Sequence, residues 1–173
     1  SEYVGIEHCC RQFLEFDTKE KILNVLKDYD IILPQPIMNG NSIEFDYANC
    51  HIHNDLLVCK EILYDMNPEI GALFDDYVSN SDKFYWSNIF IAKWDVFEQA
   101  WTFIFDVLKE YEKRMGFNRI PDWMNYVKEM GVNHEHFKER HPDLSWVEYQ
   151  MRIGGSLAER LFSFFVQYTG LKI

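Results

Sequence analysis

Three short apolar runs stand out in the chain: Tyr3–Ile6, Asp30–Leu33 and Phe84–Lys93. They are rich in β-branched and aromatic residues, so we expect each to form a strand. Asn88 interrupts the third run with a polar side chain, which needs a partner in the protein or on a ligand. The segment between the first two runs has apolar residues at helical spacing, so the strand-helix-strand pattern is typical of an α/β unit.

Apolar residues at helical spacing predict helices over much of the rest of the chain. The predicted helices begin near Thr18, cover Asp55–Met66, begin at Pro68, and cover Trp94–Met115, Pro121–Met130 and Ser156–Tyr168. The polar segment Gln35–Asn54 is predicted to be a long loop, and loops of this length usually carry function. The expected fold is therefore α/β, with a short, mostly parallel sheet and a helix-rich C-terminal half.

Composition narrows the class of protein. The 173 residues are 47% hydrophobic, which is enough for the core of one domain over residues 1–173. A net charge of −11 argues against a nucleic-acid partner and against electrostatic docking on anionic lipid. No apolar run approaches the ~20 residues of a transmembrane helix. The four cysteines form no Cys-x-x-Cys pair, and we interpret them as reduced thiols of a cytoplasmic protein.

The first candidate site follows the Tyr3–Ile6 run. His8 and Arg11 would project from the carboxyl edge of the expected sheet, where open α/β sheets bind ligands. A guanidinium grips phosphate oxygens in pairs, so a pyrophosphate or a sugar hydroxyl would fit there. The alternative is an imidazole bonded to backbone and an arginine in a surface ion pair.

Other candidate residues lie in the middle of the chain. His51 and His53 would point the same way on an extended segment, where they could bind substrate or contribute to a metal site. Asp28 and Asp30 form an Asp-x-Asp pattern, but they precede a buried strand instead of following one. We therefore interpret this pair as part of a helix-to-strand turn.

The second cluster contains Arg152, Glu159 and Arg160 around the Gly154–Gly155 step. Glu159 and Arg160 are charged residues in an otherwise apolar helix. A carboxylate in this position could act as a general base toward a hydroxyl. The alternative is an internal tie between Glu159 and an arginine or the backbone.

Four motifs occur in a fixed order: Tyr3-Val-Gly5-Ile-Glu-His8-Cys-Cys-Arg11-Gln-Phe13, Asp30-Ile-Ile-Leu-Pro34, Asn88-Ile-Phe-Ile-Ala-Lys93 and Arg152-Ile-Gly-Gly155-Ser-Leu-Ala-Glu159-Arg160-Leu-Phe162. In order and spacing they resemble a bacterial family of glycosyltransferases from capsular polysaccharide and exopolysaccharide loci, long classified as a domain of unknown function. The resemblance covers nearly the whole chain.

This resemblance implies a GT-A-like, three-layer α/β fold and a nucleotide-sugar donor, with a hexose or galactofuranose as the transferred sugar. It implies His8 and Glu159 as catalytic residues, with Glu159 as the base. Arg11 would offset diphosphate charge. The substrate would also contact residues named on chemical grounds above: His51, His53, Asn88, Arg152 and Arg160. His8 stands where the family fold usually has a metal-binding carboxylate pair, which hints at chemistry without a metal, and Mn²⁺ or Mg²⁺ stays an open alternative.

The implied acceptor is a glycan or lipid-linked glycan at the inner face of the plasma membrane, so peripheral membrane association stays open.

Two departures from the family pattern motivate a rival hypothesis. Cys9, Cys10 and Gln12 replace an arginine and two tyrosines of the family pattern, and the family's N-terminal nucleotide-binding segment is expected to precede Ser1. The rival is a non-catalytic carbohydrate-binding or protein-interaction domain, with exposed aromatic rings from Trp86, Trp94, Trp123 and Trp146.

Overall fold

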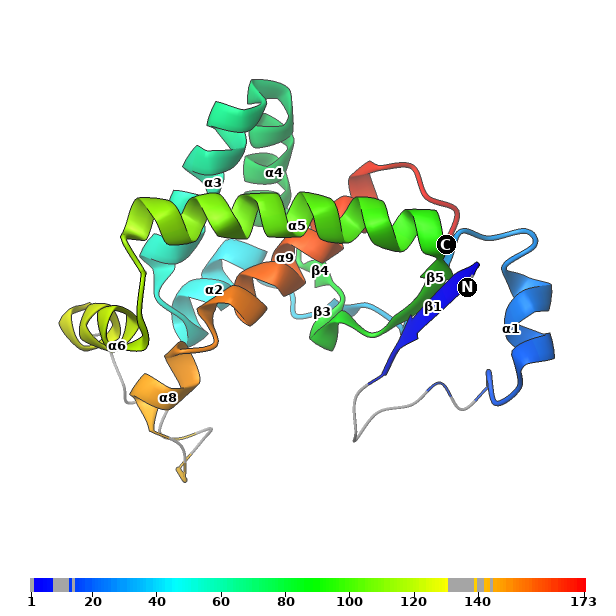
Figure 1. Cartoon of the computed structure of the whole chain (residues 1–173), viewed down its shortest axis with the longest axis horizontal. Coiled ribbons are helices and arrows are strands. Elements are labelled where there is room, and N and C mark those ends of the chain that lie inside the picture. The colour runs from blue at the N-terminus through cyan, green and yellow to red at the C-terminus, as the bar shows by residue number, and fades with distance from the viewer. Residues whose placement is uncertain (1, 8–12, 14, 131–138, 140–141, 144) are drawn as a thin grey trace. The chain divides into compact units, whose positions relative to one another are not determined.

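The computed structural model describes residues 2–7, 13, 15–130, 139, 142–143 and 145–173. These residues form eight α-helices and five short strands (Figure 1). The chain divides into two compact units. The first unit is Ser1–Met38, Lys83–Phe105 and Ala158–Ile173, and the second is Asn39–Asp82 and Asp106–Leu157. The expectation of one domain over residues 1–173 stays a prediction.

The first unit contains a three-stranded sheet in the order β1-β5-β2, made of β1 (Tyr3–Ile6), β5 (Phe90–Lys93) and β2 (Ile31–Ile32). Both β1 and β2 pair antiparallel with β5. A second, antiparallel pair joins β3 (Ile37–Met38) to β4 (Lys83–Phe84). The prediction of a mostly parallel, GT-A-like sheet is therefore wrong.

The physical reason lies in the position of β5. The strand-helix-strand pattern of β1, α1 (Lys19–Val25) and β2 was correct, and such a unit normally returns to a neighbouring parallel strand. Here β5 occupies the place between β1 and β2 and bonds to both. Its Phe90, Ile91 and Ala92 are buried, as expected for a central strand.

Side chains of β5 alternate between two apolar layers of the first unit. On one face, Ile91 packs with Leu26 and Ile32, and partly buried residues of the α1 region pack against this cluster. On the other face, Phe90 contacts Phe162 at 5.2 Å between ring centroids. Phe162 belongs to α9 (Ile153–Tyr168), and the first half of α5 (Trp94–Met115) adds further rings on this side. Helices therefore cover both faces of the small sheet.

The second unit is helical in its described part. It contains α2 (Ile43–Cys50), α3 (His53–Met66), α4 (Pro68–Asn80), α6 (Ile120–Glu129), α8 (Trp146–Gln150) and the second half of α5. The close contact of α3 with α4 depends on Gly71, because a Cβ there would lie 2.6 Å from the Cα of Tyr64. Glycine is the residue that allows this approach.

Local signals explain several helix boundaries. Thr18 caps α1 by accepting a hydrogen bond from the Lys21 amide, and Asn67 caps α4 in the same way with Pro68 in the first turn. Helix α5 has the predicted bounds and is followed by Gly116, at φ +68.

Three local predictions were wrong. The predicted loop Gln35–Asn54 contains β3 and α2, and α2 begins after the Ser42 side chain, which accepts a hydrogen bond from the Phe45 amide. The predicted strand Phe84–Lys93 is two strands separated by the 3-10 turn η1 (Trp86–Asn88). The Gly154–Gly155 step lies within the first turn of α9 instead of before it. In each case a short segment adopts a local hydrogen-bonded turn that the hydrophobic pattern does not encode.

Candidate functional site

The predicted site residues fall into three groups. His8 and Arg11 lie outside the described residues, so their roles stay predictions. Asn88, Glu159 and Arg160 belong to the first unit. His51, His53 and Arg152 belong to the second unit.

In the first unit, helix α9 holds an ion pair against the β4–η1 segment. The guanidinium Nη1 of Arg160 donates to Glu159 Oε2 at 2.9 Å, and Arg160 is only 5% exposed. The same guanidinium lies over the Phe84 ring, 5.1 Å from its centroid. Glu159 itself is partly exposed. The tie between Glu159 and an arginine, which the sequence left as the structural alternative, is thus present, and it also fixes the carboxylate in one place.

Ser163 fastens this part of α9 to the strand segment. Its hydroxyl accepts a hydrogen bond from the Tyr85 amide at 2.9 Å and lies 2.8 Å from the Glu159 carbonyl. Ser163 is fully buried. Because the two segments are joined by these contacts, the carboxylate of Glu159 is presented from a rigid support.

The η1 turn, which follows Tyr85, carries an unusual backbone conformation. Asn88 has a φ of +48, the only positive φ of a non-glycine residue in the part of the chain that is described. Its side-chain Oδ1 is buried and has no hydrogen-bond partner among the described residues. Backbone strain and an unsatisfied buried acceptor both cost free energy, and such costs are often found at functional sites. Trp86, in the same turn, is 43% exposed.

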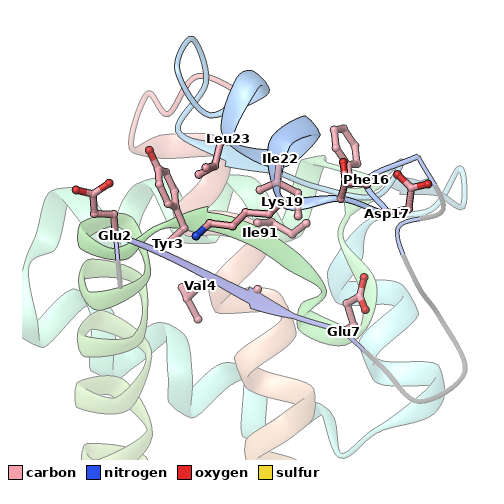
Figure 2. A pocket seen from close by; sticks show the side chains of 12 residues that line it. Glu2, Tyr3, Val4, Glu7, Phe16, Asp17, Lys19, Ile22, Leu23 and Ile91 are labelled. Carbon is pink, nitrogen blue, oxygen red and sulfur yellow. The ribbon is translucent and has the colours of Figure 1, made fainter.

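The first unit also contains a pocket of about 750 Å³ between β1 and α1 (Figure 2). We call it the β1–α1 pocket. Its lining combines apolar side chains, three carboxylates and one ammonium group: Glu2, Tyr3, Val4, Gly5, Glu7, Phe16, Asp17, Thr18, Lys19, Ile22, Leu23 and Ile91. The pocket therefore lies on the strand that leads to His8, the position where the sequence predicted a ligand.

Comparison with known proteins gives the family. The model of a domain of unknown function, DUF4422, matches residues 1–130. The chain belongs to the DUF4422 family. No curated protein and no solved structure matches it. The family resemblance expected from the motifs is therefore confirmed at the level of this family of unknown function. The assignment of the chain as a glycosyltransferase is a proposal.

In the second unit of this DUF4422 member, His51 is 6% exposed and lies between aromatic rings. Its imidazole is stacked on Tyr149 with ring centroids 5.5 Å apart, and Nδ1 lies 3.4 Å from Gln150 Oε1. Gln150 in turn donates to the Cys50 carbonyl at 2.7 Å. His51 thus has the contacts of a packed core histidine, and its predicted contact with substrate stays untested.

His53 and Arg152 lie at the surface. The Nε2 of His53 is 2.8 Å from Glu44 Oε1, and Lys60 donates to the other oxygen of Glu44 at 2.7 Å. Burial alone would raise the pKa of Glu44, but the hydrogen bonds from Lys60 and His53 outweigh it and lower the pKa to about 2. Arg152 is exposed. His53 therefore helps to join α2 to α3 through Glu44.

Sequence reasoning missed a buried carboxylate with a strongly raised pKa. Asp55, which the sequence placed only at the start of a predicted helix, lies in the first turn of α3 and is fully buried. Its Oδ1 accepts hydrogen bonds from the hydroxyls of Tyr111 at 2.8 Å and Tyr126 at 2.5 Å. Burial raises the pKa of Asp55 to about 6, although the two tyrosine hydroxyls act in the opposite direction. The tyrosines come from α5 and α6, so no local signal in the sequence could have indicated this network.

The described residues contain no group of three or more His, Cys, Asp or Glu side chains that could hold a metal ion. Asp30, from the Asp-x-Asp pattern, instead accepts a hydrogen bond from Lys93 at 2.7 Å and another from the Lys172 amide at 3.0 Å. These residues do not fit a divalent cation site, and we derive no step through a metal. No described helix is long and apolar enough to cross a membrane.

Proposed function

We propose that this DUF4422 domain is a glycosyltransferase that moves a sugar, a hexose or galactofuranose, from a nucleotide-diphosphate donor to a growing cell-surface polysaccharide. The observation that carries the proposal is the Glu159–Arg160 pair, held at 2.9 Å on a helix that contacts Phe84 and Tyr85, which precede the strained turn of Asn88. The pair supplies a fixed carboxylate and a fixed cation on one helix turn. The resemblance of the sequence motifs to a glycosyltransferase family supports the same function, and the DUF4422 match covers residues 1–130, which do not include Glu159 and Arg160.

The proposed chemistry is a single displacement. The Glu159 carboxylate takes the proton of an acceptor hydroxyl, and the oxygen of that hydroxyl forms a bond to the anomeric carbon of the donor sugar. The bond from that carbon to the diphosphate oxygen breaks, and the nucleoside diphosphate leaves with the electron pair. Arg160 positions the carboxylate, and Arg11 is proposed to stabilise the leaving diphosphate. This displacement inverts the anomeric configuration.

Asn88 is proposed to bind a sugar hydroxyl. Its Oδ1 is a buried acceptor without a partner among the described residues, and a hydroxyl donor from substrate would satisfy it. We place the reaction in the cytoplasm, at the inner face of the plasma membrane, with a lipid-linked glycan as the acceptor.

The test is release of UDP from a panel of UDP-hexoses and UDP-galactofuranose, measured with and without Mn²⁺. We expect turnover by the unaltered chain and a loss of about 100-fold or more in Glu159→Gln, which retains size but cannot take a proton. Glu98→Gln is the matched control, because Glu98 is exposed on α5 and lies in none of the sites described. Equal turnover by Glu159→Gln and the unaltered chain, or no turnover from folded protein, would refute the proposal.

A second candidate is a non-catalytic domain that binds carbohydrate or protein through aromatic rings. Of the four tryptophans named for this role, Trp86 and Trp94 are exposed, Trp146 is buried, and Trp123 packs against Phe117 at 4.3 Å. Trp94 is the first of a row of rings on α5 that ends at Phe105, which is 54% exposed. Glycan binding that is abolished by Trp94→Ala, without any turnover of donor, would favour this candidate.

A further inference from the structure

The β1–α1 pocket has mixed polar chemistry that restricts what it can bind. Carboxylates of Glu2 and Glu7 lie toward the two ends of β1, and Asp17 lies near Phe16 (Figure 2). Asp17 is engaged with Lys21 at 2.7 Å, and Glu7 Oε1 accepts a hydrogen bond from the Phe13 amide at 3.1 Å. Both carboxylates retain a second oxygen that can accept a hydrogen bond.

Lys19 supplies the one cation among the described residues that line the pocket. Its side chain extends across the pocket toward Tyr3 (Figure 2). Its ammonium group makes no hydrogen bond or ion pair with any other residue that the structure describes. An ammonium group has three donors and no acceptor, so it is available for a ligand oxygen.

Neither an anionic nor a cationic ligand can satisfy both kinds of charged group in this lining. A phosphate or diphosphate offers only acceptors and would be repelled by three carboxylates. An ammonium or guanidinium ligand would be attracted by the carboxylates, but it offers only donors, so it would leave the Lys19 ammonium without an acceptor and beside a like charge. A hydroxyl group can donate to a carboxylate and accept from an ammonium group, so a ligand with several hydroxyls satisfies both.

The apolar side chains of the pocket set a further requirement for its ligand, an apolar face that can pack against them. The apolar lining residues come from β1, α1 and β5: Tyr3, Ile22, Leu23 and Ile91. Ile91 belongs to the apolar cluster with Leu26 and Ile32, and Tyr3 and Ile22 pack against this cluster. A sugar ring presents C–H groups on one face and hydroxyls at its edge, so it can pack on this surface while its hydroxyls reach the charged groups. A volume of about 750 Å³ is within the ordinary range of small-molecule sites.

We infer that the β1–α1 pocket binds an uncharged carbohydrate. This inference deepens the proposed function and rests on it in one respect, the assignment of that carbohydrate as a part of the acceptor glycan distant from the reacting hydroxyl, because the pocket and α9 lie on opposite faces of the sheet. The nucleoside diphosphate of the donor then lies outside this pocket. The binding itself can be measured without any donor.

The experiment is saturation-transfer NMR on the folded chain with neutral mono- and disaccharides of glucose, galactose and mannose, and with UDP as the anionic probe. Methyl labels on Ile22, Leu23 and Ile91 report binding in the pocket. We expect saturation transfer to at least one neutral sugar, shifts of these methyl signals, and affinity at least fivefold weaker in Lys19→Met. Lys109→Met is the matched control, because Lys109 is exposed and does not line the pocket.

Several results would overturn the inference. They are the absence of saturation transfer to every neutral sugar, sugar binding that leaves the three methyl signals unchanged, equal affinity in Lys19→Met, and UDP shifting the same signals with tighter binding. The two proposals fail separately. Sugar binding without any turnover of donor refutes the transferase alone, whereas turnover without sugar binding in this pocket refutes the pocket assignment alone.

Discussion

Replacement of Asp55 by asparagine should change how the stability of the second unit depends on pH. The Asp55 carboxyl is fully buried and its Oδ1 accepts two tyrosine hydroxyls, while Oδ2 has no partner among the described residues. Burial raises its pKa to about 6, from an ordinary 3.8. The folded chain therefore holds this proton more tightly than the unfolded chain does.

The higher pKa of Asp55 in the folded chain decides whether stability falls or rises with pH. The protonated carboxyl contributes stability that is fully present below pH 3.8 and is lost as the pH rises through 6. Each unit of pKa difference corresponds to about 1.4 kcal/mol, so the loss is about 3 kcal/mol. The amide introduced by Asp55→Asn does not titrate, so the variant lacks this loss. The free energy of unfolding of Asp55→Asn, minus that of the unaltered chain, should increase by about 2 kcal/mol between pH 4 and pH 7, since part of the change lies below pH 4.

Urea unfolding of both proteins at half-unit steps of pH measures this difference, and contributions from the other titrating groups cancel in the subtraction. Asp95→Asn, at an exposed position on α5, controls for the loss of one negative charge. Tyr126→Phe removes a hydrogen bond that lowers the pKa of Asp55, and it should move the transition to higher pH. A difference between Asp55→Asn and the unaltered chain that is constant within about 0.5 kcal/mol would refute the reasoning, since single-site differences are measured to about that precision.

Two further substitutions test local packing and strain. Gly71→Ala places a Cβ 2.6 Å from the Cα of Tyr64 and should lower the free energy of unfolding by about 3 kcal/mol. Gly154→Ala is the control, because a Cβ there meets nothing within 4 Å and should leave the free energy of unfolding unchanged or raise it by about 0.5 kcal/mol. Equal effects of the two substitutions in urea unfolding would contradict this account of α3 and α4. Asn88→Gly removes both the strain of a non-glycine residue at φ +48 and the unsatisfied Oδ1, so it should raise the free energy of unfolding by about 1 kcal/mol and lower the rate of sugar transfer. A loss of stability would contradict the strain argument, and full activity would contradict the sugar-binding role of Asn88.

Long amphipathic helices were predictable because their own sequence specifies them. The bounds of α5 were correct, since a long apolar stripe and a following glycine mark its length and end. The strand β1 was also correct. Sheet topology was not, because the position of β5 between β1 and β2 depends on pairing between residues about 60 to 90 positions apart.

The same limit applies to the candidate site. The sequence singled out Glu159, Arg160 and Asn88, and the structure places all three in one unit, with the first two paired. The sequence indicated Asp55 only as the start of a helix, because its tyrosine partners lie 56 and 71 residues away. The β1–α1 pocket was equally hidden, since its charged residues are ordinary surface types until the fold brings them around one cavity.

The most direct test of the central claim is detection of the transferred sugar itself. The chain is incubated with UDP-hexoses or UDP-galactofuranose and a neutral oligosaccharide acceptor, and the acceptor is analysed by mass spectrometry. The account predicts an acceptor heavier by one hexose, formed by the unaltered chain and by Glu98→Gln but not by Glu159→Gln. An acceptor of unchanged mass from folded protein with every donor, or equal product from Glu159→Gln, would contradict it.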